Sequence, residues 1–322
     1  MRSPVPRARL RASALVAALA LPLTACGGAA DQAAPSGAGA SSDASFPRTV
    51  KHAMGSTEIP ARPERVVVLD TGELDSALSL GVTPVGAVTT DVASGFLSYL
   101  AEDASGVEEV GTIGEPNLEA IAALKPDLIL SNKVRHEELY DTLSGIAPTV
   151  FAEKVGAVWK DNLELAAEAL GLDEQAASAL EEYEQQAADV GEAIGDPAGM
   201  TVSAVRFVEG SIRVYTPASF IGTVLADIGL DQLSLPTAEV PTFAELSPEE
   251  LTRADADIVL YSSYGPVEES GETAALAGPL WPRLAAVEAD RAFAVEDDVF
   301  FTGIGLTAAT LMIEDLREEL AG

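Results

Sequence analysis

Cysteine is almost absent from this chain. Cys26 is the one cysteine among 322 residues, so no disulfide can form within a single chain. Because Cys26 lies near the N-terminus, the rest of the chain has no thiol to act as a nucleophile or as a metal ligand. The sequence therefore argues against thiol chemistry in any folded body that follows.

Basic residues are also scarce. The chain holds 19 lysines and arginines against 51 acidic residues. Four of the arginines precede residue 12, so the remainder has 15 basic and 51 acidic residues and a net charge of −36. Such a surface repels nucleic acid, and we expect no nucleic-acid partner. No lysine follows Lys160, which makes each arginine in the second half a candidate for a specific role.

Long apolar runs are missing. Residues 12–23 are apolar but too few to span a bilayer comfortably, and no other stretch is long and apolar enough to do so. A basic start, a short apolar centre and small residues before Cys26 are typical of a secretory signal, which we place at residues 1–25. Residues 26–45 are small, polar and rich in glycine, which predicts a disordered tether.

The residues before the cysteine read Leu23-Thr24-Ala25-Cys26. This run resembles the lipobox of bacterial lipoproteins, in which the signal is cleaved before the cysteine and its thiol receives a lipid. The resemblance implies an extracytoplasmic protein that is anchored to the cell membrane by a lipid on Cys26. The alternative is an incidental free cysteine after an ordinary secretory signal.

Common enzyme motifs are missing as well. The chain has no G-x-S-x-G, no P-loop and no H-E-x-x-H. Its two histidines, His52 and His136, are far apart in sequence and make a poor metal site. We therefore expect a protein that is not an enzyme, needs no cofactor and contributes no direct metal ligand.

Residues 46–157 alternate between apolar strands and short helices. Each predicted strand is a short apolar run rich in β-branched residues, and these runs lie at residues 66–69, 82–88, 127–130 and 148–151. Helices are predicted between them, at residues 74–80, 118–125 and 136–143. This alternation indicates an α/β lobe with a parallel sheet.

The pattern changes at residue 158 and changes back after residue 195. Residues 159–194 contain almost no helix breaker except Gly171, which predicts one long helix that is kinked near that glycine. Residues 196–322 return to strands and helices and begin with a hairpin around Gly210. The fold class we predict is α/β, with two α/β lobes joined by one long bridging α-helix. Because ligands of open α/β sheets bind beyond the carboxyl ends of the strands, we expect a ligand cleft between the lobes.

Several stretches in the first lobe carry a family signature. They read Pro63-Glu-Arg-Val-Val-Val-Leu69, Gly111-Thr-Ile-Gly114, Pro116-Asn-Leu-Glu119 and Lys125-Pro-Asp-Leu-Ile-Leu130. Together with the lipobox and the long helix, they resemble the substrate-binding proteins of ABC importers for ferric siderophores and vitamin B12. The resemblance extends from Arg48 to the end of the chain.

This resemblance implies a monomeric receptor that delivers its ligand to an ABC permease and its ATPase. The stretches around Arg135, Arg206 and Arg213 look most like those of binders of ferric citrate and of citrate-type or hydroxamate siderophores. One alternative is the same scaffold binding cobalamin or haem. Another, from a different class, is a surface-anchored enzyme.

Arginine suits a ferric chelate, because its planar fork donates several hydrogen bonds to oxygen-rich anions and stacks on flat groups. The iron itself is held by the siderophore. Arg135 follows a predicted strand, and the hairpin should bring Arg206 and Arg213 onto one face. The ligand-binding candidates are Arg135, Arg206, Arg213, Tyr215, Lys133, Tyr264 and Trp281.

The family docks onto its permease through one acidic residue on each lobe. By position, the resemblance assigns this role to Asp75, which precedes Leu80-Gly81, with aspartate in place of the usual glutamate. In the second lobe the usual position falls near Thr223, which departs from the pattern, so Asp227 one turn later becomes the candidate. The alternative for both acids is ordinary solvated surface.

Overall fold

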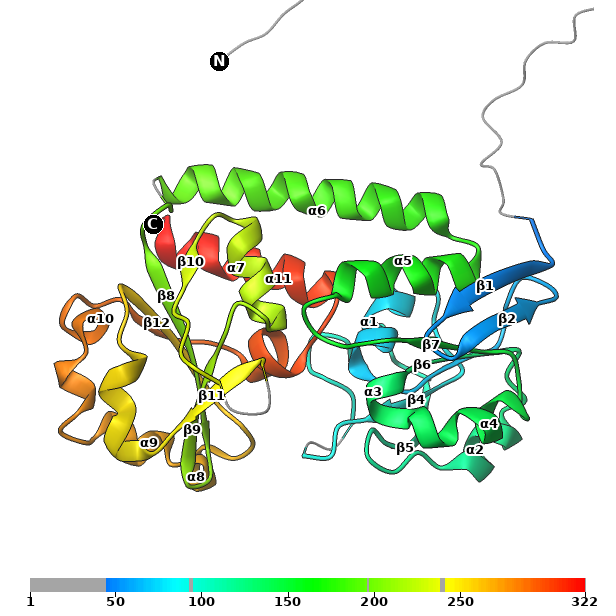
Figure 1. Ribbon diagram of the computed structural model, residues 1–322, viewed down its shortest axis with the longest axis horizontal. Coiled ribbons are helices and arrows are strands. Elements are labelled where there is room, and N and C mark those ends of the chain that lie inside the picture. Colours follow the sequence, from blue (N-terminus) through cyan, green and yellow to red (C-terminus); the bar gives the residue numbers. More distant parts are fainter. Residues whose placement is uncertain (1–44, 93–94, 196, 238–240, 322) are drawn as a thin grey trace, which may run out of the picture. The chain divides into compact units, whose positions relative to one another are not determined.

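The computed structural model describes residues 45–92, 95–195, 197–237 and 241–321. The predicted signal peptide, Cys26 and nearly all of the predicted tether lie outside these residues. The described chain folds into an N-terminal and a C-terminal lobe, each built on its own sheet (Figure 1). In this part of the chain, no helix has both the length and the apolar character that a membrane crossing requires.

The N-terminal lobe contains a five-stranded sheet in which every neighbouring pair of strands is parallel. In spatial order its strands are β5 (Glu108–Thr112), β4 (Gly86–Thr89), β3 (Val66–Val68), β6 (Leu128–Asn132) and β7 (Thr149–Ala152). All residues of β3, β4, β6 and β7 are buried, as expected for a parallel sheet with both faces covered. The prediction of a parallel α/β lobe is confirmed.

Short helices connect these strands. They are α1 (Thr71–Ser79), α2 (Leu118–Ala123), α3 (Lys133–His136), the 3₁₀ turn η1 (Glu137–Leu139) and α4 (Tyr140–Ser144). An antiparallel pair, β1 (Arg48–His52) and β2 (Gly55–Ile59), precedes the sheet. The sequence did not predict this pair or β5, because neither segment has a run of apolar residues.

The C-terminal lobe has a mixed sheet. Its main path runs β11 (Phe243–Leu246), β9 (Ser211–Tyr215), β8 (Thr201–Val208), β12 (Ile258–Ser263) and β13 (Ala292–Ala294), while β10 (Asp231–Gln232) also pairs with β8. The predicted hairpin is confirmed as β8 and β9, which are antiparallel and place Arg206 directly opposite Arg213. Gly210 supplies the positive φ of 75° at its turn.

The helices of this lobe are mostly short. They are α7 (Phe220–Asp227), η2 (Pro248–Ala254), α8 (Val267–Ser270), α9 (Glu272–Leu276), η3 (Trp281–Arg283), α10 (Ala285–Glu288), the π-helical turn η4 (Asp298–Thr302) and α11 (Leu306–Leu320).

Residues 158–195 form two helices and not the single helix that we predicted. The first, α5 (Trp159–Leu170), ends where Gly171 adopts the left-handed conformation with φ of 73°. The chain reverses there, and α6 (Asp173–Ile194) runs back along both lobes (Figure 1). The bridge is therefore α6 alone, whose 22 residues span about 33 Å.

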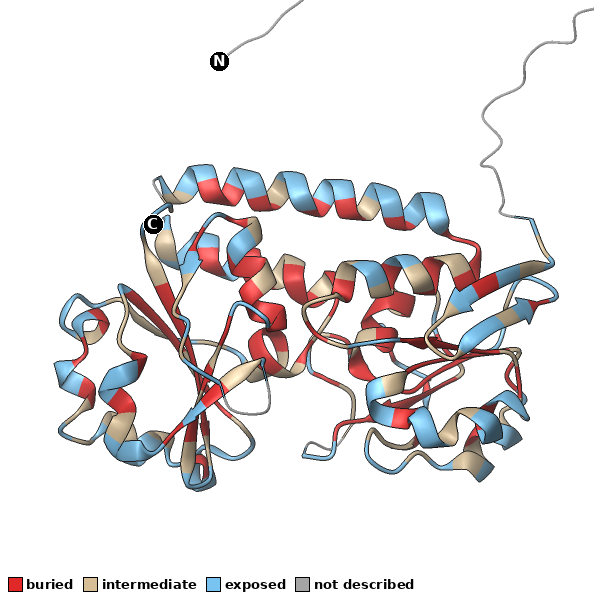
Figure 2. Ribbon diagram, in the orientation of Figure 1, coloured by how far each residue is buried: buried red, intermediate tan, exposed pale blue. Residues whose placement is uncertain are grey.

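The bridging helix is amphipathic. Its buried side chains recur at helical spacing and face the rest of the protein (Figure 2); they are Ala176, Leu180, Tyr183, Ala187 and Val190. They belong to one apolar cluster that contains residues of both lobes, from Val66 and Leu128 to Val202 and Leu260. The two lobes thus share a core, which limits how far they can separate.

Asp75 links the lobes from the inside. It lies on α1, is fully buried, and accepts hydrogen bonds from the backbone N–H groups of Thr307 and Ala308 over 3.0 and 3.1 Å. These N–H groups begin α11, whose N-terminus favours a negative charge. The hydroxyl of Tyr99 donates a third hydrogen bond over 3.1 Å. The prediction that Asp75 docks on a permease is therefore wrong, because its carboxylate has no access to a partner.

The contact between Asp75 and α11 also explains why residue 305 is a glycine. Gly305 has φ of 138°, and a Cβ atom at this position would lie 2.4 Å from Cγ of Asp75. Only glycine lets the chain enter α11 so close to the carboxylate.

We expect Asp75→Asn to change the pH dependence of stability. Burial raises the pKa of Asp75 from 3.8 to about 6, so its protonation favours the folded state, and this stabilisation is lost as pH rises through about 6. Between pH 7 and pH 5, the free energy of unfolding of the wild type should rise by about 1 kcal/mol relative to that of the variant. Chemical denaturation at both pH values measures this difference. Glu181→Gln, an exposed change on α6, is the control, and a difference that does not vary with pH would contradict the assignment.

Candidate functional site

A cleft of about 280 Å³ lies between the two lobes. Its N-terminal wall comes from the loops and turns that follow the parallel strands: Asp70 and Thr71 after β3, Thr90 and Asp91 after β4, Arg135 after β6, and Val155 after β7. Its C-terminal wall comes from the second sheet and from η4: Arg206, Tyr215, Phe243, Tyr264, Phe301 and Thr302. The cleft therefore lies where the strand ends predict it.

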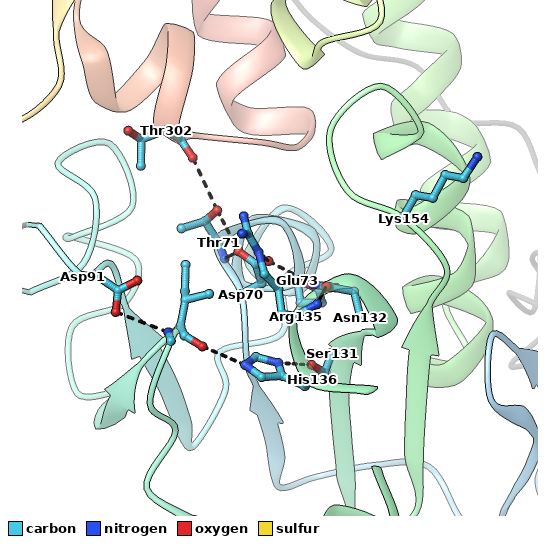
Figure 3. A network of polar contacts seen from close by, with 12 residues as sticks. Asp70, Thr71, Glu73, Asp91, Ser131, Asn132, Arg135, His136, Lys154 and Thr302 are labelled. Atoms are coloured by element: carbon cyan, nitrogen blue, oxygen red, sulfur yellow. Dashed lines mark hydrogen bonds and ion pairs between the residues drawn. The ribbon is translucent and has the colours of Figure 1, made fainter. Parts of the chain in front are cut away.

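Asp70 organises the N-terminal wall (Figure 3). It is 2% exposed and caps α1, because its Oδ1 accepts a hydrogen bond from the backbone N–H of Thr71 over 2.7 Å. Its Oδ2 accepts from Nδ2 of Asn132 over 2.9 Å and from Nε of Arg135 over 3.2 Å. Both oxygens are thus engaged before any ligand arrives.

Arg135 is held at this wall by two contacts. The side chain of Asn132 caps α3 by accepting the backbone N–H of Arg135 over 3.0 Å, and Asp70 fixes the orientation of the guanidinium. The side chain remains 43% exposed. Arg135 lines the cleft, and its terminal nitrogens, Nη1 and Nη2, have no hydrogen-bond partner among the described residues.

Glu73 lies behind this pair and is also buried. Its Oε1 accepts from Nδ2 of Asn132 over 3.3 Å, and its Oε2 has no partner among the described residues. Burial, followed by the negative charge of Asp70, raises the pKa of Glu73 and so favours its neutral form.

His136 supports the wall from below (Figure 3). Its Nε2 lies 2.8 Å from the carbonyl oxygen of Ile113, which can only accept, so Nε2 carries the proton. Nδ1 then accepts from the hydroxyl of Ser131 over 2.7 Å. Burial lowers the pKa of His136, which favours the neutral ring. Its two hydrogen bonds connect α3 to Ser131 and to Ile113.

Arg206 organises the opposite wall. It is 5% exposed and pairs with Asp297 through two nitrogens, with Nε lying 2.6 Å from Oδ1. Nη1 donates to the hydroxyl of Tyr215 over 3.3 Å, and Nη2 donates to Oγ1 of Thr302 over 2.5 Å. Burial alone would lower the pKa of Arg206, but the hydrogen bonds and charge of Asp297 outweigh it and raise the pKa above its ordinary value.

Aromatic rings surround this guanidinium. Its Cζ lies 4.3 Å from the ring centroid of Tyr264 and 5.6 Å from that of Phe301. Tyr215 packs on Phe301 and on Phe243, with centroids 4.9 and 5.7 Å apart. The C-terminal wall is thus a group of aromatic rings around one buried cation, whereas the N-terminal wall is mostly polar.

Of the predicted ligand-binding residues, the structure places Arg135, Arg206, Tyr215 and Tyr264 in the cleft lining. Arg213 lies just behind it, with Cζ 4.5 Å from the ring centroid of Phe243 and Nε 3.6 Å from the carboxylate of Glu245. Whether these residues bind a ligand stays a prediction.

Two more of the predicted binding residues, Trp281 and Lys133, also lie outside the cleft lining. Trp281 is 8% exposed and packs against Phe207 and Tyr261 in the core of the C-terminal lobe. Lys133 shares helix α3 with Arg135 but points toward Glu153, 3.4 Å away. Both residues were predicted to bind the ligand, but on helix α3 Lys133 contacts Glu153 whereas Arg135 contacts Asp70.

Asp227 lies at the end of α7, with its side chain 25% exposed. Its carboxylate accepts from the hydroxyl of Tyr183 over 2.9 Å and lies 3.1 Å from Nζ of Lys160. These contacts tie α7 to α5 and α6. The docking role of Asp227 stays a prediction.

Sequence reasoning missed Asp70, Phe243, Asp297, Phe301 and Thr302. Asp70 could have been found, because it directly follows a predicted strand. The others depend on pairings across the fold, since Asp297 is 91 residues from Arg206 in the chain. Within the described residues, no three His, Cys, Asp or Glu side chains are grouped so that they could hold a metal ion.

Comparisons with known proteins identify relatives of this chain in sequence and in fold. The chain is 39% identical over 281 residues to the probable siderophore-binding lipoprotein YfiY of Bacillus subtilis, covering 84% of this chain and 86% of that protein. It is 30% identical over 261 residues to the achromobactin-binding periplasmic protein of Dickeya dadantii, covering 79% and 85%. The crystal structure of Staphylococcus aureus SirA complexed with staphyloferrin B matches with a TM-score of 0.75 and 31% identity, over 85% of this chain and 98% of that one.

A family model described as periplasmic binding protein matches residues 66–299, from the first strand of the parallel sheet into η4. This range contains all but three residues of the cleft lining, namely Phe301, Thr302 and Ile304. The chain belongs to the periplasmic binding protein family, whose members bind solutes and are not enzymes.

Proposed function

We propose that this protein captures a ferric siderophore of the citrate or hydroxamate type outside the cytoplasm and delivers it to an ABC permease and its ATPase. The observation that carries the proposal is a cleft that places the open guanidinium of Arg135 opposite an aromatic wall. A ferric chelate needs both, because it offers acceptor oxygens on a rounded and partly apolar body. The siderophore-binding relatives support this choice of ligand.

The protein recognises the chelate without touching the iron. The siderophore fills the metal's coordination sphere, so the cleft has to supply only hydrogen-bond donors and apolar contact. Arg135 donates from the N-terminal wall. Tyr215 can donate its hydroxyl proton from the C-terminal wall, because its oxygen already accepts from Arg206.

A lipid on Cys26 would hold this receptor at the membrane that contains the permease. The lipobox at residues 23–26 and the relatives named as lipoproteins support the anchor. Residues 27–45 are rich in glycine, alanine and serine, a composition that suits a flexible tether.

Titration with ferric chelates tests the function. The protein without its signal, with Cys26 replaced by alanine, should show saturable quenching of its tryptophan fluorescence by a citrate-type or hydroxamate ferric chelate. Trp159 and Trp281 are both buried, so collisional quenching by free chelate should be weak. Free N-acetyltryptophanamide corrects for absorption by the chelate. Saturable binding of cobalamin or haem, with none of any ferric chelate, would overturn the proposal.

We expect Arg135→Ala to weaken chelate binding by about tenfold, or about 1.4 kcal/mol, because the variant loses the donors on the N-terminal wall. Lys133→Ala is the matched control. It removes the same charge from the same helix, but Lys133 lies outside the cleft lining and faces Glu153. An equal loss of affinity in both variants would show that only general charge matters.

We expect Cys26→Ala in the full chain to release the protein from the cell membrane without changing its chelate affinity. Fractionation of cells that express the variant should find it in the medium or the periplasm. A variant that stays in the membrane fraction would mean that the anchor is not a lipid on this residue.

A further inference from the structure

Arg206 has little left to offer a ligand. An arginine has five N–H donors, and in Arg206 four of them are engaged, two with Asp297, one with Thr302 and one with Tyr215. One N–H on Nη1 remains. Arg206 is thus a positioning residue that orients the hydroxyl of Tyr215 and the ring of Tyr264, more than an open receptor for an anion.

Arg135, in contrast, has most of its N–H donors free. Its Nε donates to Asp70, while its two terminal nitrogens have no partner within the described residues. A fork of this kind matches one carboxylate or one pair of adjacent acceptor oxygens. The cleft therefore offers an anionic ligand a single open guanidinium.

Acidic residues offset the positive charge of the cleft. Its lining contains Asp70 and Asp91 as well as Arg135 and Arg206, and Asp297 pairs with Arg206 directly behind the lining. Arg213, the third arginine of this region, lies outside the cleft lining, and its Nε is 3.6 Å from the exposed carboxylate of Glu245 without a hydrogen bond. The site as a whole has no excess of positive charge, although its arginines alone would predict one.

The charge of the rest of the protein acts in the same direction. After the first four arginines the chain carries a net charge of −36, and a field of this sign slows the approach of an anion and raises its free energy near the protein. A chelate with several negative charges would be repelled by this field. In the cleft it would find one guanidinium with free donors, that of Arg135, close to the carboxylates of Asp70, Asp91 and Asp297.

We propose that the cleft selects ferric chelates of low net charge, either neutral or with one negative charge, and that Asp297 sets this preference by neutralising Arg206. This inference rests on the proposed function. Within that function it narrows the ligands from ferric siderophores in general to those whose iron complex carries little charge.

Two chelates of different charge test the preference. Ferrichrome is a neutral ferric trihydroxamate, and ferric dicitrate is a multiply charged anion. At low ionic strength the wild type should bind ferrichrome about tenfold or more tighter than ferric dicitrate. This comparison uses the unaltered binding site, so it does not depend on how any variant folds.

Asp297→Asn tests the residue. It keeps the shape of the side chain and one acceptor for Arg206 but removes the charge. We expect it to raise the affinity for ferric dicitrate relative to that for ferrichrome by about fivefold or more, and this ratio is the readout because the altered contact with Arg206 changes the wall that both chelates meet. Glu245→Gln is the matched control, because it neutralises the partner of Arg213 outside the cleft lining and should change neither affinity by more than about twofold.

The outcomes separate the two proposals. A wild type that binds ferric dicitrate as tightly as ferrichrome, or an Asp297→Asn variant whose affinity for ferric dicitrate does not rise relative to that for ferrichrome, overturns the charge preference alone. Thermal unfolding of the variant shows whether a loss of both affinities reflects a damaged fold, and in that case the wild-type comparison decides. No saturable binding of any ferric chelate overturns the proposed function, and the charge preference with it.

Discussion

The contact between Asp75 and the start of α11 is the interaction on which the cleft depends. It places a buried carboxylate from the first lobe under the first backbone N–H groups of the last helix, which packs along α6 and α7. A buried charge is tolerated only where hydrogen bonds replace water, and here two N–H groups and the hydroxyl of Tyr99 do so. If the lobes moved apart, the carboxylate would lose the two N–H groups of α11 and keep only the hydroxyl of Tyr99, which lies in its own lobe. The contact therefore favours one spacing of the two walls.

The bridge and the shared core act with this contact. Helix α6 crosses both lobes, and its apolar face belongs to a cluster that continues through each of them. A polar contact also joins the two lobes at the cleft, where Oγ1 of Thr71 donates a hydrogen bond to the carbonyl oxygen of Thr302 over 3.4 Å. A cleft held in this way is suited to rigid ligands, because it cannot close far around a smaller one. Preorganisation of this kind reduces the ordering cost of binding.

The sequence predicted the parts of this fold that follow from local pattern. Parallel strands with every residue buried gave continuous apolar runs, and the strand-end rule then placed Arg135 and the cleft. The hairpin register paired Arg206 with Arg213. The reversal at Gly171 was harder to foresee, because a single glycine in a helical pattern can produce either a kink or an end. Here the left-handed conformation of Gly171 ends α5.

The errors in the predicted site have a common physical origin. Asp75 was assigned by its position before Leu80-Gly81, but burial depends on what packs against α1, and that element is more than 200 residues away. Trp281 was predicted to bind the ligand, but it packs in the core of the second lobe. Asp297 was missed, because it is 91 residues from Arg206 and the local sequence around Arg206 does not indicate its partner. Local sequence identifies a side chain that could act, whereas its availability depends on distant partners.

The partner acids explain why arginine content is a poor guide to ligand charge. A guanidinium that is 5% exposed pays a large desolvation cost unless a carboxylate and hydrogen bonds compensate it. Asp297 meets that need, and in doing so it removes most of the attraction that Arg206 could exert on an anion. The more firmly an arginine is buried in a binding wall, the more completely it must be neutralised by the protein itself. In this cleft the exposed Arg135 keeps its open fork, so the guanidinium with the fewest protein contacts is the one best placed to bind an anionic group.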